Sequence, residues 1–129
     1  MTRQSDSRPG LHESDLTQFC GSAEFYQHWA KRLAYTEGVQ YMAERGGAYW
    51  LIDAVASYQP DQRIASRQDL VDFQLWQLAV AQDKSAVLTM RGDSDQPAVI
   101  TQEIPFTDFP LKQIKLYVSG GTLMLPSEY

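Results

Sequence analysis

The sequence has almost no cysteine, no long apolar run and no apolar leader, and each absence excludes a class of protein. Cys20 is the one cysteine among 129 residues, so neither an intrachain disulfide nor a cysteine-based zinc site is expected. No window reaches the roughly 18 apolar residues of a membrane span, because Asp53 interrupts the longest apolar run. Residues 1–15 are polar and lack the apolar region of a secretory signal. We therefore expect a cytoplasmic protein that contacts no membrane.

The common catalytic and cofactor motifs are missing as well. The chain contains no G-x-S-x-G pattern, no P-loop, no G-x-G-x-x-G after a strand and no H-E-x-x-H. Gly46-Gly47 precedes an apolar segment, but without the lysine and hydroxyl residue of a phosphate loop it indicates a turn between helices. No cofactor and no metal ion is predicted.

Composition indicates a globular and acidic protein. Hydrophobic residues make up 43% and aromatic residues 12% of the chain, and its length suits one domain. We expect a flexible leader over residues 1–15 and a single domain over residues 16–129. The net charge of −5 does not favour direct binding to nucleic-acid phosphates, but it is compatible with a basic protein surface.

The stretch from Thr36 to Tyr58 is expected to organise the domain. Thr36 is a candidate N-cap for a helix that runs to Arg45, where Gly46-Gly47 ends it. Residues 48–58 follow as a second helix that is apolar on almost every side, which predicts a position at the centre of the core. Pro60 ends this helix, because the residue before a proline is disfavoured in the α conformation.

Upstream of this stretch, a further amphipathic helix is predicted over Ala23–Leu33. Phe25, Trp29 and Leu33 recur every four residues and form one apolar stripe, and Ser22 is a candidate N-cap. Downstream, residues 59–72 are mostly polar and are interpreted as a connector with about one helical turn.

From Phe73 onward the pattern changes to short runs of aromatic and branched residues. Five strands are predicted, at residues 73–80, 86–90, 98–104, 114–118 and 122–125. Ser119-Gly120-Gly121 indicates a hairpin, and Phe106 and Phe109 are expected to be buried where residues 105–110 cross the sheet. The fold class is α+β, with N-terminal helices packed on a C-terminal antiparallel sheet of four to five strands. Because several strands are apolar on both faces, we expect loops or a partner to cover the second face.

Asp53 and His28 are the candidates for catalysis. A buried Asp53 could act as a general acid or base, and alternatively it could cap a backbone group or pair with Arg45 or Lys31. His28 is the histidine expected to be fixed in the fold, since His12 lies in the leader.

Two further roles for His28 are open. It could join Glu24, Asp53 or Glu103 in a metal site, with a solvated Glu24–His28 pair as the alternative. It could also activate Cys20 as a nucleophile, with a buried structural thiol as the alternative.

A second group of residues is a candidate for an interface. Tyrosine and tryptophan dominate binding hot spots, and acids at one end of the sheet could contact a basic partner or simply be solvated. The interface candidates are Asp93, Asp95, Glu103, Asp108 and Trp76.

Several stretches resemble an uncharacterised family of small bacterial proteins, often found in cyanobacteria and on plasmids or phages. The most specific are YWLIDA within residues 33–59 and QEIPFTDFPL within residues 101–111. The resemblance carries no activity, cofactor or catalytic residue. It implies a mobile-element setting, in which small accessory proteins often bind a host or defence protein.

The leading hypothesis is a small acidic protein-binding module, a regulator or inhibitor of a host nucleic-acid-handling or defence complex that presents acids where phosphates normally bind. The first alternative is a small enzyme or ligand-binding domain that uses Asp53 and His28. The second is a structural homodimer joined through sheet edges or exposed aromatic residues.

Overall fold

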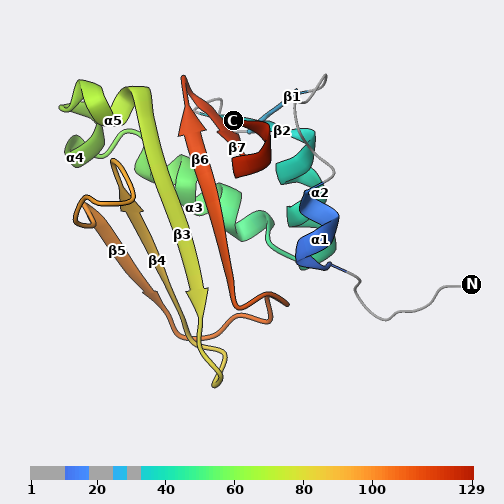
Figure 1. The fold of residues 1–129 in the computed structure, drawn as a ribbon. Coiled ribbons are helices and arrows are strands. Elements are labelled where there is room, and N and C mark those ends of the chain that lie inside the picture. Colours follow the sequence, from blue (N-terminus) through green and yellow to red (C-terminus); the bar gives the residue numbers. More distant parts are fainter. Residues whose placement is uncertain (1–10, 18–24, 29–32) are drawn as a thin grey trace, which may run out of the picture.

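The structure is a computed structural model that describes residues 11–17, 25–28 and 33–129 (Figure 1). Its helices are α1 (Glu13–Leu16), α2 (Glu37–Gly46), α3 (Tyr49–Tyr58), α4 (Gln62–Ala65) and α5 (Gln68–Asp72), followed near the end of the sequence by the 3-10 helix η1 (Pro126–Glu128). Its strands are β1 (Phe25–Gln27), β2 (Ala34–Thr36), β3 (Phe73–Val80), β4 (Ala86–Arg91), β5 (Ile100–Ile104), β6 (Gln113–Ser119) and β7 (Thr122–Met124).

The strands that the structure describes form one mixed sheet in the order β1-β2-β7-β6-β3-β4-β5. Neighbouring strands are antiparallel except for β2 and β7, which are parallel. The predicted antiparallel sheet of four to five strands is therefore wrong, although the α+β class holds. Two strands from the N-terminal part, β1 and β2, extend the C-terminal sheet and account for the difference.

The helix predicted over Ala23–Leu33 is also wrong. Phe25–Gln27 forms β1, and Tyr26 pairs with Tyr35 across an antiparallel ladder. The two tyrosine rings stack with their centroids 5.6 Å apart. The four-residue spacing of apolar residues could not reveal the strand at Phe25–Gln27, where aromatic residues pack against cross-strand neighbours.

The two central helices begin and end close to the predicted positions. Thr36 caps α2 by accepting a hydrogen bond from the Val39 N–H (3.2 Å). Gly47 ends α2 in the left-handed conformation (φ 63°), and its N–H donates to the Ala43 carbonyl. α3 follows, ends before Pro60 and buries Leu51, Ile52, Val55 and Ala56. Tyr49, Asp53 and Ser57 are exposed, so α3 covers one side of the core and does not lie at its centre as predicted.

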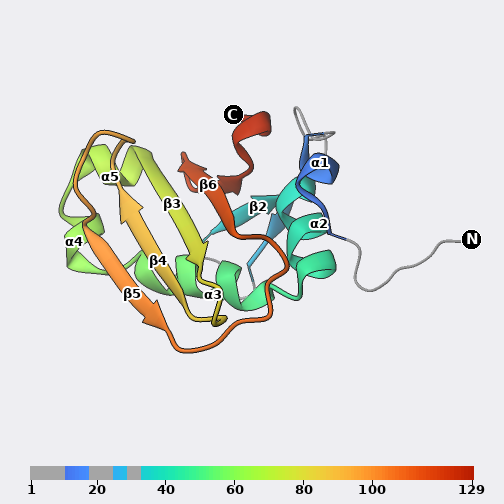
Figure 2. The same cartoon turned by 60° about the horizontal axis from the view of Figure 1, so that its bottom comes forward.

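The core lies between α2 and α3 and one face of the sheet, here called the inner face (Figure 2). Alternate residues of each strand point to this face. In β3 these are the buried Gln74, Trp76 and Leu78, and the Trp76 ring lies 5.7 Å from that of Tyr58 on α3. β4 contributes Ala86, Leu88 and Met90, and β6 contributes Ile114, Leu116 and Val118.

The turns and loops between the strands and helices agree with some of the predictions and differ from others. Gly120 and Gly121 have φ of 58° and 82° and form a two-residue turn between β6 and β7. The hairpin was predicted, but Ser119 is the last residue of β6 and not part of the turn. Phe109 is buried in the crossover after β5, but Phe106 is 66% exposed, so the burial expected for Phe106 is wrong. The polar connector contains two short helices, α4 and α5, where one turn was expected.

The N-terminal part is described only in pieces. Of the predicted leader, residues 1–10 lie outside the described residues. Leu11 is buried in the core, and His12 precedes α1. Within the described parts of the chain, no helix is both long enough and apolar enough to cross a membrane.

Candidate functional site: the open face of the sheet

The two catalytic candidates do come together. His28 follows β1, and its Nε2 donates to the Asp53 Oδ1 on α3 over 2.7 Å. His28 is 5% exposed, whereas the side chain of Asp53 is 56% exposed. Asp53 is therefore not the buried acid that the proposed general acid or base required. The hydrogen-bond partner that the structure shows for it is His28. Arg45, one of the partners considered for it, lies 5.3 Å from the centre of the Tyr41 ring, and Lys31 lies outside the described residues.

This pair has the geometry of a structural link. The backbone N–H of His28 also donates to the Leu33 carbonyl (2.8 Å), so the backbone after β1 is fixed to the residue just before β2. The side-chain bond then ties this hairpin to α3. Of the other residues considered with His28, Glu103 is exposed on β5. Glu24 and Cys20 lie outside the described residues. No group of three or more potential metal ligands occurs in the described part of the chain.

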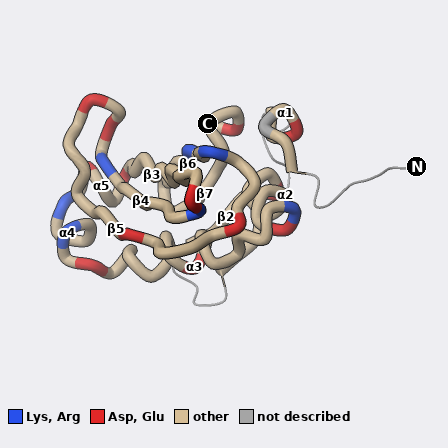
Figure 3. Tube along the Cα trace, turned by 90° about the horizontal axis from the view of Figure 1, so that it is seen from below, with Lys and Arg blue, Asp and Glu red and all other residues tan. Residues whose placement is uncertain are grey.

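The predicted acidic residues do not gather at one end of the sheet. Asp93 and Asp95 lie in the loop before β5, Glu103 lies on β5, and Asp108 lies in the segment after it. A strand of five residues spans about 17 Å, so the first two and the last stand at opposite ends of β5. Acidic positions are correspondingly spread around the chain (Figure 3). A single acidic surface that imitates phosphates is not formed by these four residues.

Trp76 is likewise no surface residue. It is 1% exposed, and its Nε1–H donates to the Gln74 Oε1 over 2.8 Å within the core. The period-two alternation of β3 nevertheless places its odd-numbered residues on the other face of the sheet, here called the open face. Phe73 stands there, three residues before Trp76.

On the open face, an aromatic cluster joins three segments. Phe73 on β3, Tyr117 on β6 and Tyr129 after η1 pack their rings with centroids 5.2 to 5.4 Å apart. The Tyr117 and Tyr129 rings meet edge to face at 85°, a favourable arrangement of ring quadrupoles. Phe73 and Tyr117 are half-buried, and Tyr129 is 70% exposed.

The rest of the open face is uncovered by any described helix, and α2 and α3 lie on the opposite side of the sheet (Figures 1 and 2). Leu75 continues the cluster along β3, between its ladder partners Arg91 and Tyr117. Gln77 and Thr89 form the next cross-strand pair, and Val87 is exposed beyond them. The face is thus apolar and aromatic at one end and polar along its middle.

Sequence reasoning missed this cluster, although its signal was present. The residues FQLWQLAV at 73–80 and QIKLYVS at 113–119 each carry an aromatic residue on the face opposite to the core side chains. The alternation within each strand would have placed Phe73 and Tyr117 on one face. Their adjacency depends on the pairing of β3 with β6, which brings together residues 44 positions apart (117 − 73) and is not visible in local patterns.

A separate tyrosine group lies beside the helices. Tyr49 is 44% exposed, and partial burial of its ring raises the pKa of its hydroxyl. The nearby Glu44, Tyr35 and Tyr26 raise this pKa further, because each disfavours a second negative charge. Tyr49 precedes Asp53 by one turn of α3, and both are exposed. This surface is on the helix side of the molecule, away from the open face.

Fold and site together define a small α+β domain with a mixed sheet, helices on one face and an aromatic-bearing open face on the other. The chain belongs to a family of unknown function, DUF6876, whose model matches residues 11–129. An uncharacterised family was expected from the sequence, and the match confirms that much. Searches among curated proteins and among solved structures gave no match.

Proposed function

We propose that the protein is a protein-binding module that contacts its partner through the open face of the sheet. The observation that carries the proposal is the cluster of Phe73, Tyr117 and Tyr129, packed ring against ring and exposed at Tyr129. Tyrosine is enriched in binding hot spots because it presents a large, rigid and amphipathic ring. Here three elements hold the rings in place, which reduces the entropy lost on binding.

The chemistry of the face favours a protein over a nucleic acid. Exposed rings on a sheet can also stack on unpaired bases, but such surfaces combine stacking with a strongly positive groove. This chain carries a net charge of −5. By the ladder register the open face mixes the cations Arg91 and Lys115 with the acid Glu103, so it does not form a strongly positive groove. The partner we propose is a host protein that an accessory protein of a mobile element would regulate or inhibit.

The test is affinity capture from a lysate of the native host, followed by mass spectrometry. The wild type is compared with Tyr129→Ser and Tyr117→Ser on the open face and with Tyr49→Ser on the helix side. We expect the same protein to be recovered with the wild type and with Tyr49→Ser, and to be lost with the two open-face variants. Circular dichroism checks that each variant is folded.

Other outcomes would contradict the proposal in defined ways. Recovery with the open-face variants and loss with Tyr49→Ser would move the contact surface to the helix side. A second copy of this chain as the partner would appear as a dimer in light scattering that Tyr129→Ser dissociates, which supports the homodimer alternative. Tight binding of a single-stranded oligonucleotide that Tyr117→Ser abolishes would replace the protein partner with a nucleic acid.

A second candidate function, a small-ligand or proton-transfer site, is favoured by the 2.7 Å bond between His28 and Asp53. An imidazole oriented by a carboxylate is the arrangement that general bases use. The test is a fragment screen by ¹H–¹⁵N NMR on the wild type and on Asp53→Asn. Ligands that shift the His28 resonances only in the wild type would support this candidate, and a screen without such ligands would leave the pair as a structural link.

A further inference from the structure

The first half of β6 has no strand partner on the side away from β3. Pro126 explains why the pairing with β7 stops. Tyr117 pairs with Met124 on β7, so the same register would bring Lys115 opposite Pro126. Proline has no N–H to donate, and it therefore stops the ladder. β7 ends at Met124, and the chain turns into η1 instead.

Unpaired backbone N–H and C=O groups of β6 point out from this free edge and make it polar. The Val80 N–H donates to the Lys112 carbonyl over 2.7 Å, so the backbone of Lys112 points toward β3. Successive residues of a strand direct their backbone groups to alternate sides, and the N–H and C=O of Lys115 consequently point away from β3. No backbone hydrogen bond of Lys115 to a loop or helix is found in the described part of the chain.

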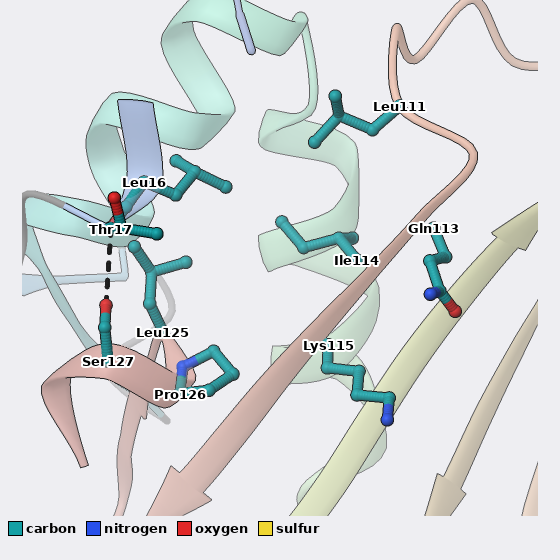
Figure 4. Close-up of a pocket in the computed structure, with 9 residues that line it drawn as sticks. All are labelled: Leu16, Thr17, Leu111, Gln113, Ile114, Lys115, Leu125, Pro126 and Ser127. Atoms are coloured by element: carbon teal, nitrogen blue, oxygen red, sulfur yellow. Dashed lines mark hydrogen bonds between the residues drawn. The ribbon is translucent and has the colours of Figure 1, made fainter. Parts of the chain in front are cut away.

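A pocket of about 340 Å³ lies along this free edge (Figure 4). Leu16 from α1 and Leu125 and Pro126 from the segment after β7 form one wall, and Leu111 and Ile114 form the other. The Ser127 hydroxyl donates to the Leu16 carbonyl (3.3 Å) and holds the first wall together. The volume is at the lower end of the range of about 300–1,000 Å³ for small-molecule sites.

One charged group borders this apolar pocket. Lys115 extends from β6 at the side of the pocket opposite to Leu16 (Figure 4), and its side chain is exposed. Its ammonium forms no ion pair with any residue that the structure describes. A cation beside an apolar cavity and a free backbone N–H is complementary to a carboxylate attached to an apolar body.

We propose that this pocket binds a small apolar monocarboxylic acid, with the hydrocarbon part between Leu16, Ile114 and Leu125 and the carboxylate at Lys115. The site lies at the β7 edge of β6 and does not depend on the aromatic cluster. It therefore gives the protein a ligand-binding activity separate from the proposed protein contact.

The test uses octanoate as the probe acid and octanol as its uncharged analogue, with the full chain and isothermal titration calorimetry. The variant Lys115→Gln removes the charge and keeps the length of the side chain. Lys112→Gln is the matched control, since it removes a neighbouring exposed lysine that does not line the pocket. Because Lys115 is exposed and water screens its charge, octanoate should bind Lys115→Gln about three- to fivefold more weakly than the wild type.

The control should bind octanoate with the affinity of the wild type, and octanol should bind the wild type and Lys115→Gln equally. In ¹H–¹⁵N NMR, octanoate should shift the amides of Leu16, Lys115 and Ser127. Equal octanoate affinity for the wild type and Lys115→Gln would overturn the proposal, as would shifts confined to other regions. Absence of octanoate binding to the wild type at millimolar concentration would overturn it as well.

Discussion

Gln74 is a buried polar residue whose hydrogen bonds can be counted completely. Its Nε2 donates to the Gln59 Oε1 and to the Leu70 carbonyl, both over 2.9 Å. Its Oε1 accepts from the Gln59 Nε2 (3.0 Å) and from the Trp76 Nε1 (2.8 Å). Both donors and both lone pairs of the amide are therefore used. The amide joins α3, α5 and β3 inside the core.

The substitution Gln74→Leu should break this junction at a measurable cost. It leaves the Trp76 N–H and the Leu70 carbonyl buried without their partner, and each such group costs about 1–3 kcal/mol. Gln59 is half-buried and can turn to water. After the gain from a more apolar side chain, we expect a net loss of about 2–4 kcal/mol in the free energy of unfolding.

Urea denaturation followed by tryptophan fluorescence measures this loss. The control is Gln77→Leu, three residues along the same strand but on the open face, where the amide donates to the exposed Gln113 over 3.0 Å. Its expected effect is within about 0.5 kcal/mol, as for other surface substitutions. A loss for Gln74→Leu no larger than for Gln77→Leu would refute the reasoning, because the buried groups would then have found other partners at no cost.

Three further predictions concern the helix ends and an ion pair. Thr36→Ala removes the cap of α2 and the bond from the Thr36 hydroxyl to the Glu128 carboxylate (2.6 Å), and should cost about 1–2 kcal/mol in urea denaturation; Thr36→Ser keeps the hydroxyl, and an equal loss for both variants would contradict the capping role. Gly47→Ala should cost about 1 kcal/mol from backbone strain alone, since φ is 63° and an added Cβ would meet nothing within 4 Å; unchanged thermal stability would contradict this. The hydrogen bonds from the Arg63 side chain and, to a smaller extent, from the Arg63 backbone N–H lower the pKa of Asp61 from 3.8 to about 2. Because the folded-state pKa is the lower one, Asp61 stabilises the fold above about pH 4 and loses this effect as the pH falls toward 2. NMR titration of the Asp61 carboxyl checks this pKa, and a midpoint near 3.8 would refute it.

Short sequence patterns predicted the structure correctly where a single residue determines the local backbone conformation. Thr36 as a cap, Gly47 as a helix end and Gly120-Gly121 as a hairpin turn are each determined by side-chain chemistry within a few residues. β3 was predicted with its observed bounds, Phe73–Val80, because its aromatic and branched residues lie between polar segments.

The remaining features depend on contacts between distant residues. β1 and β2 are each three residues long, too short for a periodic signal, and β2 is held by its parallel pairing with β7 near the other end of the sequence. The bond between His28 and Asp53 spans 25 positions, so the sequence identified both residues but not their contact. The aromatic cluster likewise required the register of β3 and β6.

Photo-crosslinking measures most directly whether the open face of the sheet is the contact surface. A benzoylphenylalanine in place of Tyr129 reports on the open face, and the same group in place of Tyr49 reports on the helix side. The account predicts that irradiation in a host lysate joins one protein to the chain labelled at position 129, and that the chain labelled at position 49 gives no such product. The same product from position 49 alone would contradict the account.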